Sequence, residues 1–278
     1  MVAHTLLSSG THLAAKVATA EASALSLVVL RLTAAALIFT LVIAMTPGPR
    51  LPARRHWPSF IAFGFVAGPL NQGLFLWGVQ HSNATHASLL YALTPIGVYL
   101  VSLALRREAR HPRRFIGAAV AFTGVLLLFV LGDKTLAGGH WWGDLAILGA
   151  VAAWVAWTIE ARRLSPIYGG LRTSGWATIA GSIWLLPGFA LIDWPELGAA
   201  DATLWACLGY LVLGTSVVSY VLWNWSLARV DASRVAIFTN LQPVATALLA
   251  FVLLGEHLGW ETALGGLLVL VGVRVAQS

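Results

Sequence analysis

The chain has 278 residues, of which 58% are hydrophobic and 10% are charged, and its mean hydropathy is +0.80. Soluble globular domains carry about 25% charged residues, so this composition indicates an integral membrane protein. The single cysteine, Cys207, excludes an intramolecular disulfide, and eight scattered histidines without an HExxH pattern predict neither a metal site nor a cofactor.

Ten apolar stretches are long enough to cross a hydrocarbon layer of about 30 Å. Because lipid offers the backbone no hydrogen-bond partners, each stretch is expected to be a helix. The sequence therefore predicts an all-α membrane protein with ten transmembrane helices. In chain order, they span residues 3–19, 23–45, 57–79, 85–105, 115–132, 143–161, 171–192, 202–227, 232–254 and 260–275.

Arginine residues concentrate in every second loop between these stretches, whereas Lys134 is the only Lys or Arg residue in the opposite loops. Since Lys and Arg favour cytoplasmic loops, both termini are predicted to be cytoplasmic. The membrane is predicted to be the plasma membrane, which is the inner membrane in a Gram-negative cell. The same bias explains the net charge of +6, so no nucleic-acid partner is expected. The loops assigned to the cytoplasm carry Arg50, Arg54, Arg55, Arg106, Arg107, Arg110, Arg113, Arg114, Arg162, Arg163, Arg172, Arg229 and Arg234.

Identical residues recur at a constant separation of 148 positions along the chain. Such an offset predicts two copies of one unit, over residues 1–132 and 143–278. Five helices per copy is an odd number, so the second copy must enter the membrane from the opposite side. Inverted repeats of this kind favour alternating access to a central site. The matched pairs are Pro95 and Pro243, Glu108 and Glu256, Gly117 and Gly265, and Gly124 and Gly272.

The matched residues suggest different roles according to their chemistry. Pro95 and Pro243 lie in the middle of predicted helices, where proline removes a backbone hydrogen bond and bends the helix. We therefore expect these two helices to move as gates. The paired glutamates are expected to organise the helix hairpins that follow them, and the paired glycines to permit close helix approach.

Polar and aromatic side chains at the depth of the membrane centre predict the substrate site. Together they indicate an uncharged, aromatic-lined cavity for a neutral or zwitterionic metabolite, although each polar group could instead bond a neighbouring helix. Lys16 and Arg31 are expected to reach towards an interface or to pair with an acid such as Glu21. Trp184 is either a cavity residue or a packing residue. The candidate substrate-binding residues are His12, Asn71, Gln72, Tyr91, Tyr99, Trp154, Trp157, Thr158, Ser219, Tyr220 and Asn240.

Several short motifs resemble the repeat of the drug/metabolite transporter superfamily, and in particular its ten-helix EamA branch. The second half reads Leu-Trp-Asn at 222–224, Arg-Val-Asp-Ala-Ser-Arg at 229–234, Leu-Gln-Pro at 241–243 and Leu-Leu-Gly-Glu-His-Leu at 253–258. The first half carries a weaker version at Trp77, Ala84, 93–95 and 107–108. The resemblance spans the chain and implies an exporter of amino acids or other small metabolites, of the aromatic amino acid exporter type.

The resemblance leaves the substrate and the coupling open. Related four-helix multidrug exporters use a carboxylate in their first helix for proton coupling. The first helix here has none, so downhill or exchange transport is expected. A broad-specificity drug or metabolite carrier is the main alternative, and a noncatalytic membrane subunit is a remote one. The sequence contains no GxSxG motif, so an intramembrane enzyme is not expected. The expected partners are a small-molecule substrate and the lipid bilayer, and a monomer is compatible with the sequence.

Overall fold

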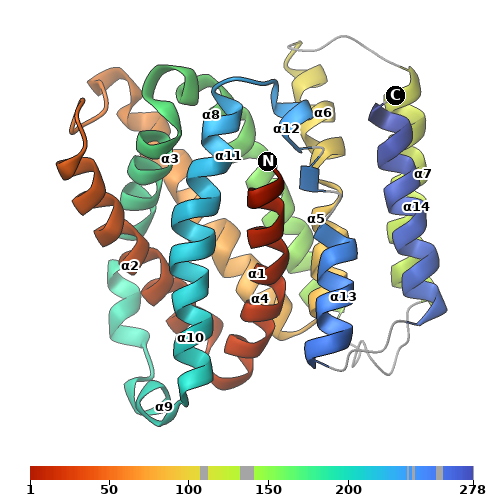
Figure 1. Ribbon diagram of the computed structural model, residues 1–278, viewed down its shortest axis with the longest axis horizontal. Coiled ribbons are helices and arrows are strands. Elements are labelled where there is room, and N and C mark those ends of the chain that lie inside the picture. Colours follow the sequence, from red (N-terminus) through yellow and green to blue (C-terminus); the bar gives the residue numbers. More distant parts are fainter. Residues whose placement is uncertain (107–111, 132–140, 237, 240–241, 255–258, 278) are drawn as a thin grey trace.

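The computed structural model describes residues 1–106, 112–131, 141–236, 238–239, 242–254 and 259–277. These residues form helices without any β-strand (Figure 1). Within these residues, five helical stretches are long and apolar enough to cross a membrane. They are Ala24–Met45, Arg54–Gln80, His86–Ala104, Trp141–Ile183 and Ala202–Leu227.

The elements follow the predicted helices closely at most of their ends. In the first half they are α1 (Val2–Glu21), α2 (Ala24–Met45), η1 (Arg54–His56), α3 (Trp57–Phe65), η2 (Val66–Leu70), α4 (Asn71–Gln80), α5 (Ala84–Tyr91), α6 (Thr94–Ala104) and α7 (Pro112–Leu131). In the second half they are α8 (Trp141–Ile183), η3 (Leu186–Leu191), α9 (Trp194–Ala199), α10 (Ala202–Tyr210), η4 (Leu211–Ser219), α11 (Tyr220–Leu227), α12 (Ala232–Ala236), α13 (Gln242–Leu254) and α14 (Trp260–Gln277).

The connection predicted between residues 161 and 171 is largely helical. α8 continues through it and departs from helical geometry at Gly169, where φ is +75° and ψ is 166°. Glycine adopts a positive φ without steric cost, so the chain changes direction there in a single residue. α8 thus contains the sixth predicted helix and most of the seventh, whose last part is the 3-10 helix η3.

In each half, the third predicted helix contains a π-helical segment that the sequence did not predict. These helices are residues 57–79 and 202–227. η2 joins α3 to α4, and η4 joins α10 to α11. Shifting η2 by 148 positions places it inside η4. A π segment widens the helix and rotates the residues that follow it, and such segments are frequent at functional sites. Asn71 and Tyr220 are the first residues after them.

The helix predicted around Pro95 is broken, not bent as predicted, and the stretch predicted around Pro243 is described as two elements, α12 and α13. α5 ends at Tyr91 and α6 begins at Thr94, whereas α12 ends at Ala236 and α13 begins at Gln242. Pro95 and Pro243 therefore stand in the first turn of a new helix. In that position, the missing N–H of proline would have no helical partner in any case. α6 and α13 begin 148 positions apart.

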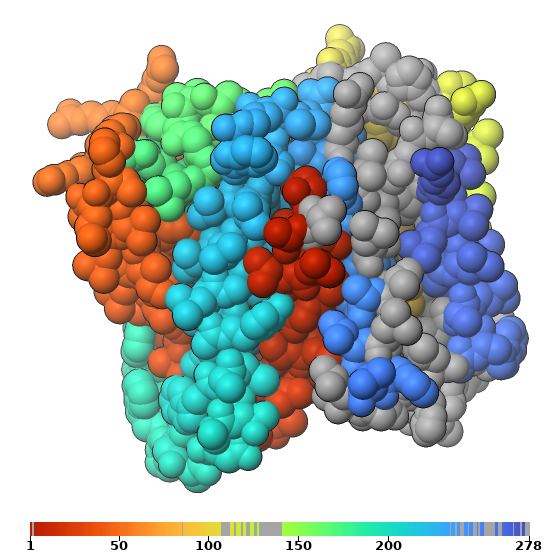
Figure 2. Space-filling model, in the orientation of Figure 1, coloured from red at the N-terminus to blue at the C-terminus, as the bar shows by residue number. Residues whose placement is uncertain are grey.

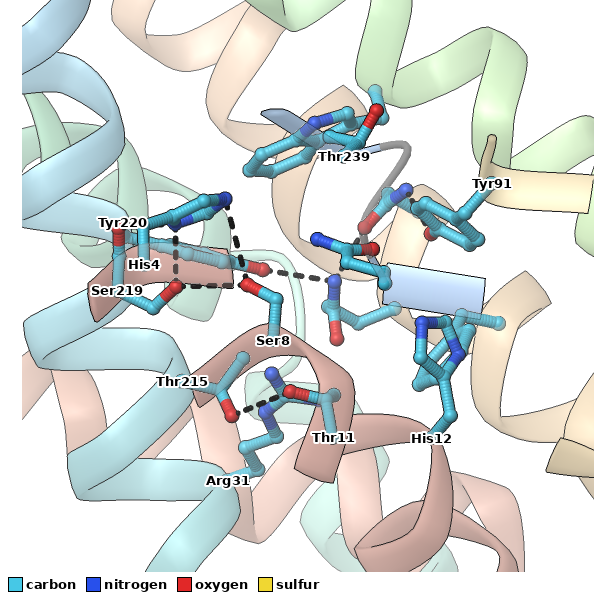
Figure 3. Close-up of a pocket in the computed structure, with 15 residues that line it drawn as sticks. His4, Ser8, Thr11, His12, Arg31, Tyr91, Thr215, Ser219, Tyr220 and Thr239 are labelled. Atoms are coloured by element: carbon cyan, nitrogen blue, oxygen red, sulfur yellow. Dashed lines mark hydrogen bonds between the residues drawn. The ribbon is translucent and has the colours of Figure 1, made fainter. Parts of the chain in front are cut away.

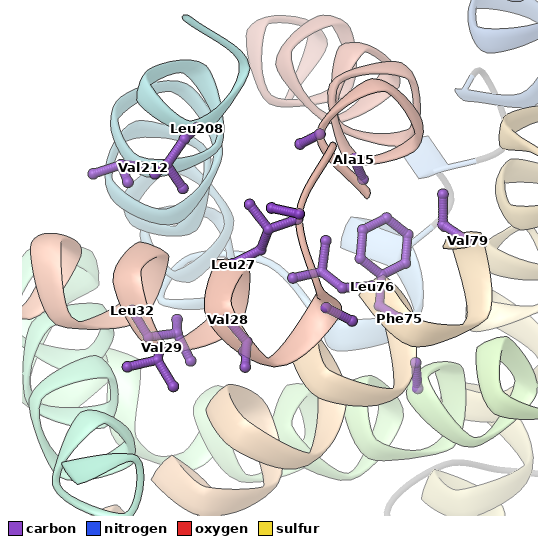
Figure 4. Packing of buried hydrophobic residues seen from close by; sticks show 14 of the residues in the cluster. Ala15, Leu27, Val28, Val29, Leu32, Phe75, Leu76, Val79, Leu208 and Val212 are labelled. Atoms are coloured by element: carbon purple, nitrogen blue, oxygen red, sulfur yellow. The ribbon is translucent and has the colours of Figure 1, made fainter. Parts of the chain in front are cut away.

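The core is a tightly packed cluster in which α1, α2, α4, α8 and α10 meet (Figure 4). Ala15, Leu27, Leu76 and Ile147 are fully buried there. Lipid tails are as apolar as these side chains, so close packing is what stabilises the contact. Small residues make it possible: a Cβ added to Gly78 of α4 would lie 2.7 Å from the carbonyl oxygen of Gly143 in α8.

α7 and α14 pack along each other at one side of the bundle (Figure 1). The matched glycines of these two helices, Gly117, Gly124, Gly265 and Gly272, are all buried. Their role in close helix approach stays a prediction, and Glu108 and Glu256 lie outside the described residues. α10 and η4 lie beside α1 on the face seen in Figure 2. Trp205, Leu213 and Val218 are exposed on these two elements, as suits a surface in contact with lipid.

The α2–α3 connection lies near the turn of α8 at the upper end of the bundle in Figure 1, and arginine side chains make contacts there. Arg172 donates to the carbonyl oxygens of Pro47 and Pro49 at 2.6 and 3.0 Å. Arg162 reaches Asp231, before α12, at 3.2 Å. Three of the loops predicted to be cytoplasmic, those around residues 46–56, 162–172 and 228–231, therefore contact one another in pairs, whereas residues 107–111 of the fourth lie outside the described residues.

The opposite end joins α1, α4, α5 and α8 through polar contacts. The Lys16 ammonium donates to the carbonyl oxygen of Val79 at 3.2 Å and also to that of Ser82, after the end of α4. The Ser82 hydroxyl donates to Asp144 of α8 at 2.5 Å, and His86 of α5 lies 3.5 Å from the other oxygen of that carboxylate. These contacts join the four helices at this end of the bundle.

Candidate functional site

A central cavity of about 60 Å³ lies between the two halves of the chain (Figure 3). This volume exceeds the roughly 10–15 Å³ that one water molecule needs. α1, α2, α4, α5, α8, η4, α11 and α13 contribute to its walls. The lining residues are His4, Ser8, Thr11, His12, Arg31, Asn71, Gln72, Phe75, Tyr91, Trp154, Thr215, Ser219, Tyr220, Thr239 and Gln242.

A chain of hydrogen bonds crosses the cavity from one half of the protein to the other. Asn71 donates to the Tyr91 hydroxyl at 3.0 Å and to the carbonyl oxygen of Ala150 at 2.6 Å. Gln72 donates to the Asn71 side-chain oxygen and, at 2.8 Å, to the Tyr220 hydroxyl. The π segments η2 and η4 immediately precede Asn71 and Tyr220, so the two widened helices present these groups to each other.

α1 forms one wall through a stripe of polar residues. The Ser8 hydroxyl lies 3.0 Å from that of Ser219, which in turn lies 2.7 Å from Nδ1 of His4. Thr11 and Thr215 pair their hydroxyls at 2.8 Å. These contacts fasten α1 to η4, as the dashed lines in Figure 3 show.

Aromatic rings form two further walls. His12, Phe75 and Tyr91 meet edge to face, with ring centroids 5.5 to 5.6 Å apart. Trp154 packs on Tyr220 with a centroid separation of 5.3 Å. The cavity therefore combines apolar, polarisable surfaces with hydroxyl and amide groups that can orient a solute.

Arg31 is the charged residue of the lining. Its Nε donates to the Ser216 hydroxyl at 2.8 Å, and the whole side chain is 0% exposed. Its two terminal nitrogens, Nη1 and Nη2, have no hydrogen-bond partner in the described part of the chain. The expectation that Arg31 reaches an interface or pairs with Glu21 is wrong. The residue lies about two turns from the start of α2, and its side chain is fully buried, so its head does not reach water.

Seven of the predicted substrate-binding residues meet in this cavity: His12, Asn71, Gln72, Tyr91, Trp154, Ser219 and Tyr220. Asn240 lies outside the described residues. The other lining residues, His4, Ser8, Thr11, Phe75, Thr215, Thr239 and Gln242, are not among the predicted substrate-binding residues. His4, Ser8 and Thr11 recur at helical spacing on one face of α1, and this spacing was a usable signal for three of them.

Four other candidates lie elsewhere. Tyr99 packs against Phe115, with ring centroids 6.1 Å apart, because the break after Tyr91 turns α6 away from the face that α5 presents. Trp157 and Thr158 lie about one turn, roughly 5 Å, beyond Trp154 along α8. Trp157 lines a smaller second cavity, and Thr158 donates to the Trp154 carbonyl oxygen. Trp184 is 54% exposed and packs on Phe65, so it is no cavity residue.

Comparison with known proteins gives a consistent result. Residues 1–130 and 141–276 match the family described as "EamA-like transporter family". The "Probable terminal-alkyne amino-acid exporter" of Streptantibioticus cattleyicolor is 29% identical over 248 residues, which cover 88% of this chain and 81% of that protein. The "Uncharacterized transporter YyaM" of Bacillus subtilis is 24% identical over 250 residues, covering 88% and 81%.

Two further similarities concern the membrane and the fold. The "Uncharacterized inner membrane transporter YicL" of Salmonella typhimurium is 28% identical over 228 residues, covering 80% of this chain and 74% of that protein. A crystal structure with 19% sequence identity superposes with a TM-score of 0.71 and covers 98% of this chain and 94% of its own. At 19% identity, the similarity to this crystal structure shows that the two proteins share a fold.

Proposed function

Since this chain belongs to the EamA-like transporter family and is a membrane transporter, we propose that it exports amino acids or similar small metabolites, with aromatic or other apolar side chains favoured. The observation that carries this proposal is the cavity, where the hydrogen-bonded chain from Tyr91 to Tyr220 lies between aromatic walls. Polar groups would orient the backbone of an amino acid, and the rings would contact its side chain. One relative is named as a probable amino-acid exporter.

We further propose ten transmembrane helices in two inverted five-helix units, with both termini in the cytoplasm. The recurrence of a π segment and of a helix break at a separation of 148 positions supports the duplication. The gathering of arginine residues at one end of the bundle supports the orientation. α7 and α14, which pair at one side, would then be the fifth and tenth helices and would support the transport pathway from outside.

Transport would proceed by alternating access. The contacts of Lys16, Ser82 and Asp144 hold the end opposite the arginine loops closed, so export requires these contacts to break. α6 and α13 begin at the cavity next to their prolines, and their rotation about these breaks would open one side while closing the other. The lining residues include no Asp or Glu. The proposed mode is therefore downhill or exchange transport, without a proton-carrying carboxylate.

Counterflow in liposomes that contain only this protein tests the proposal. Vesicles loaded with unlabelled phenylalanine, leucine or alanine should accumulate the labelled amino acid, with and without a pH gradient. Asn71→Ala should abolish the accumulation, because Asn71 holds Tyr91 and the α8 backbone together. Transport of unrelated amphiphilic cations in place of every amino acid would favour the broad-specificity alternative. Silence across amino acids and other metabolites alike would overturn the transport assignment to this cavity.

A further inference from the structure

We propose that Arg31 binds a carboxylate of the transported solute, so that the cavity selects amino acids or organic acids over their uncharged and amine counterparts. The inference rests on the proposed transport function and names the chemical group that the cavity recognises. Its starting point is a guanidinium that is fully buried and bound through only one of its three nitrogens.

The position of Arg31 meets the geometric requirement. The side chain lines the cavity and lies beside the paired hydroxyls of Thr11 and Thr215 in Figure 3. Ser216 accepts from Nε at 2.8 Å and so fixes the plane of the guanidinium. Nη1 and Nη2 are left as two adjacent donors in a fork, which matches the two oxygens of a carboxylate.

The charge balance requires a counter-ion of this kind. An arginine inside a membrane protein is costly unless it is paired, and such residues usually mark a solute pathway. Neither Asp nor Glu is among the lining residues, and the residues around Arg31 offer neutral hydroxyl and amide groups. A bound carboxylate would satisfy both free nitrogens and neutralise the buried charge. The protein itself supplies no acid for that role in the described lining.

The remainder of the solute would contact the aromatic walls. Figure 3 shows Arg31 and the Thr11–Thr215 pair on one side of the site and His12 and Tyr91 on the other. A solute with its carboxylate on Arg31 would therefore extend an apolar or aromatic group towards the rings of Tyr91 and Phe75. This arrangement gives the cavity a polar end and an aromatic end.

Ligand binding to the purified protein tests the proposal independently of transport. Calorimetric titration would use sets of compounds with one side chain each, for example phenylalanine, N-acetylphenylalanine, phenylalaninamide and phenethylamine, and corresponding sets from leucine and alanine. In at least one set, we expect the amino acid and its N-acetyl derivative, which both carry a carboxylate, to bind at least about tenfold more tightly than the amide and the amine. A difference of this size corresponds to one charge-assisted pair. Equal binding of acid and amide, or no binding of any carboxylate, overturns the proposal.

Variants then assign the effect to the residue. Arg31→Met should remove the preference for the carboxylate, and Arg31→Lys should keep part of it, because a single ammonium retains the charge but not the fork. Arg229→Met is the matched control, since Arg229 is exposed and stacks on Trp225 at 3.9 Å. A preference that survives in Arg31→Met contradicts the assignment. If Arg31→Met does not fold, the comparison of acid with amide on the wild-type protein still tests whether the cavity prefers a carboxylate.

The two proposals fail in different ways. Carboxylate-selective binding without counterflow would leave the role of Arg31 standing and reject export as the function. Counterflow that is equally fast for phenylalanine and phenylalaninamide would support transport and reject the role of Arg31.

Discussion

Gln72 donates a 2.8 Å hydrogen bond to the hydroxyl of Tyr220, and the two residues are 148 positions apart. The same separation relates Pro95 to Pro243 and the start of α6 to the start of α13. Equivalent residues of two symmetry-related units can touch only near the axis that relates the units. We infer that the axis of the proposed inverted repeat passes through this hydrogen bond, in the wall of the cavity.

The Gln72–Tyr220 pair should couple the two halves energetically. Tyr220→Phe removes the acceptor and leaves a buried amide N–H with one partner fewer, so we expect a stability loss of about 1–2 kcal/mol. Combined with Gln72→Leu in a double-mutant cycle, the pair should show a coupling energy of about 0.5–1.5 kcal/mol in detergent unfolding. Tyr210→Phe is the control, because Tyr210 donates to the carbonyl oxygen of Leu7 at 2.7 Å and lies outside the cavity lining. Strict additivity of Gln72→Leu and Tyr220→Phe would contradict the prediction.

The two prolines should affect transport more than assembly. Pro95→Ala or Pro243→Ala restores a backbone donor in the first turn of α6 or α13 and favours a continuous helix across the break. We expect the transport rate to fall at least about tenfold while the amount of protein in the membrane stays within about twofold. Counterflow and quantitative blotting measure the two quantities. Wild-type transport in both variants would speak against a gating role for the breaks.

The contacts of Asp144 should hold one end of the pathway closed. Asp144→Asn removes the charge that faces His86 and weakens the acceptor for the Ser82 hydroxyl. In a Cys207→Ser background with Ser8→Cys as reporter, an impermeant thiol reagent added from that end should label the cavity several-fold faster. Asp193→Asn is the control, since Asp193 caps the start of α9 through the Glu196 amide at 3.0 Å. Unchanged labelling of the reporter in Asp144→Asn would exclude such a latch.

Two glycines of α4 provide a matched test of helix packing. A Cβ on Gly78 would lie 2.7 Å from the Gly143 carbonyl oxygen, whereas a Cβ on Gly73 would meet nothing within 4 Å. Gly78→Ala should therefore cost about 1–3 kcal/mol through overpacking. Gly73→Ala should be neutral or gain up to about 1 kcal/mol in helix propensity. Thermal unfolding in detergent compares the two directly, and an equal loss in both variants would refute the close α4–α8 contact.

The sequence predicted the membrane class, the helical stretches and seven residues of the cavity. Composition and apolar length are properties of each segment alone, so they can be read without knowing the fold. His12, Asn71 and Tyr220 were identified because polar groups at the middle of an apolar helix fit lipid poorly, whatever their neighbours. The resemblance to the EamA branch rested on short motifs that are contiguous in the chain.

Only the tertiary structure decided which of these groups face one another. A regular period of 3.6 residues per turn would place Tyr99 on the same helix face as Tyr91, but the break at the start of α6 redirects the helix. The π segments that turn Asn71 and Tyr220 into the cavity interrupt the same period and leave no mark in hydropathy. Arg31 was expected at an interface because the residues next to it in the sequence do not indicate how deeply its side chain is buried. The hydrogen bond of Arg31 to Ser216 and its two nitrogens without a partner become visible only when α2, η4 and α1 are packed together. Burial and hydrogen bonding of this side chain depend on all three elements, so no single helix determines them.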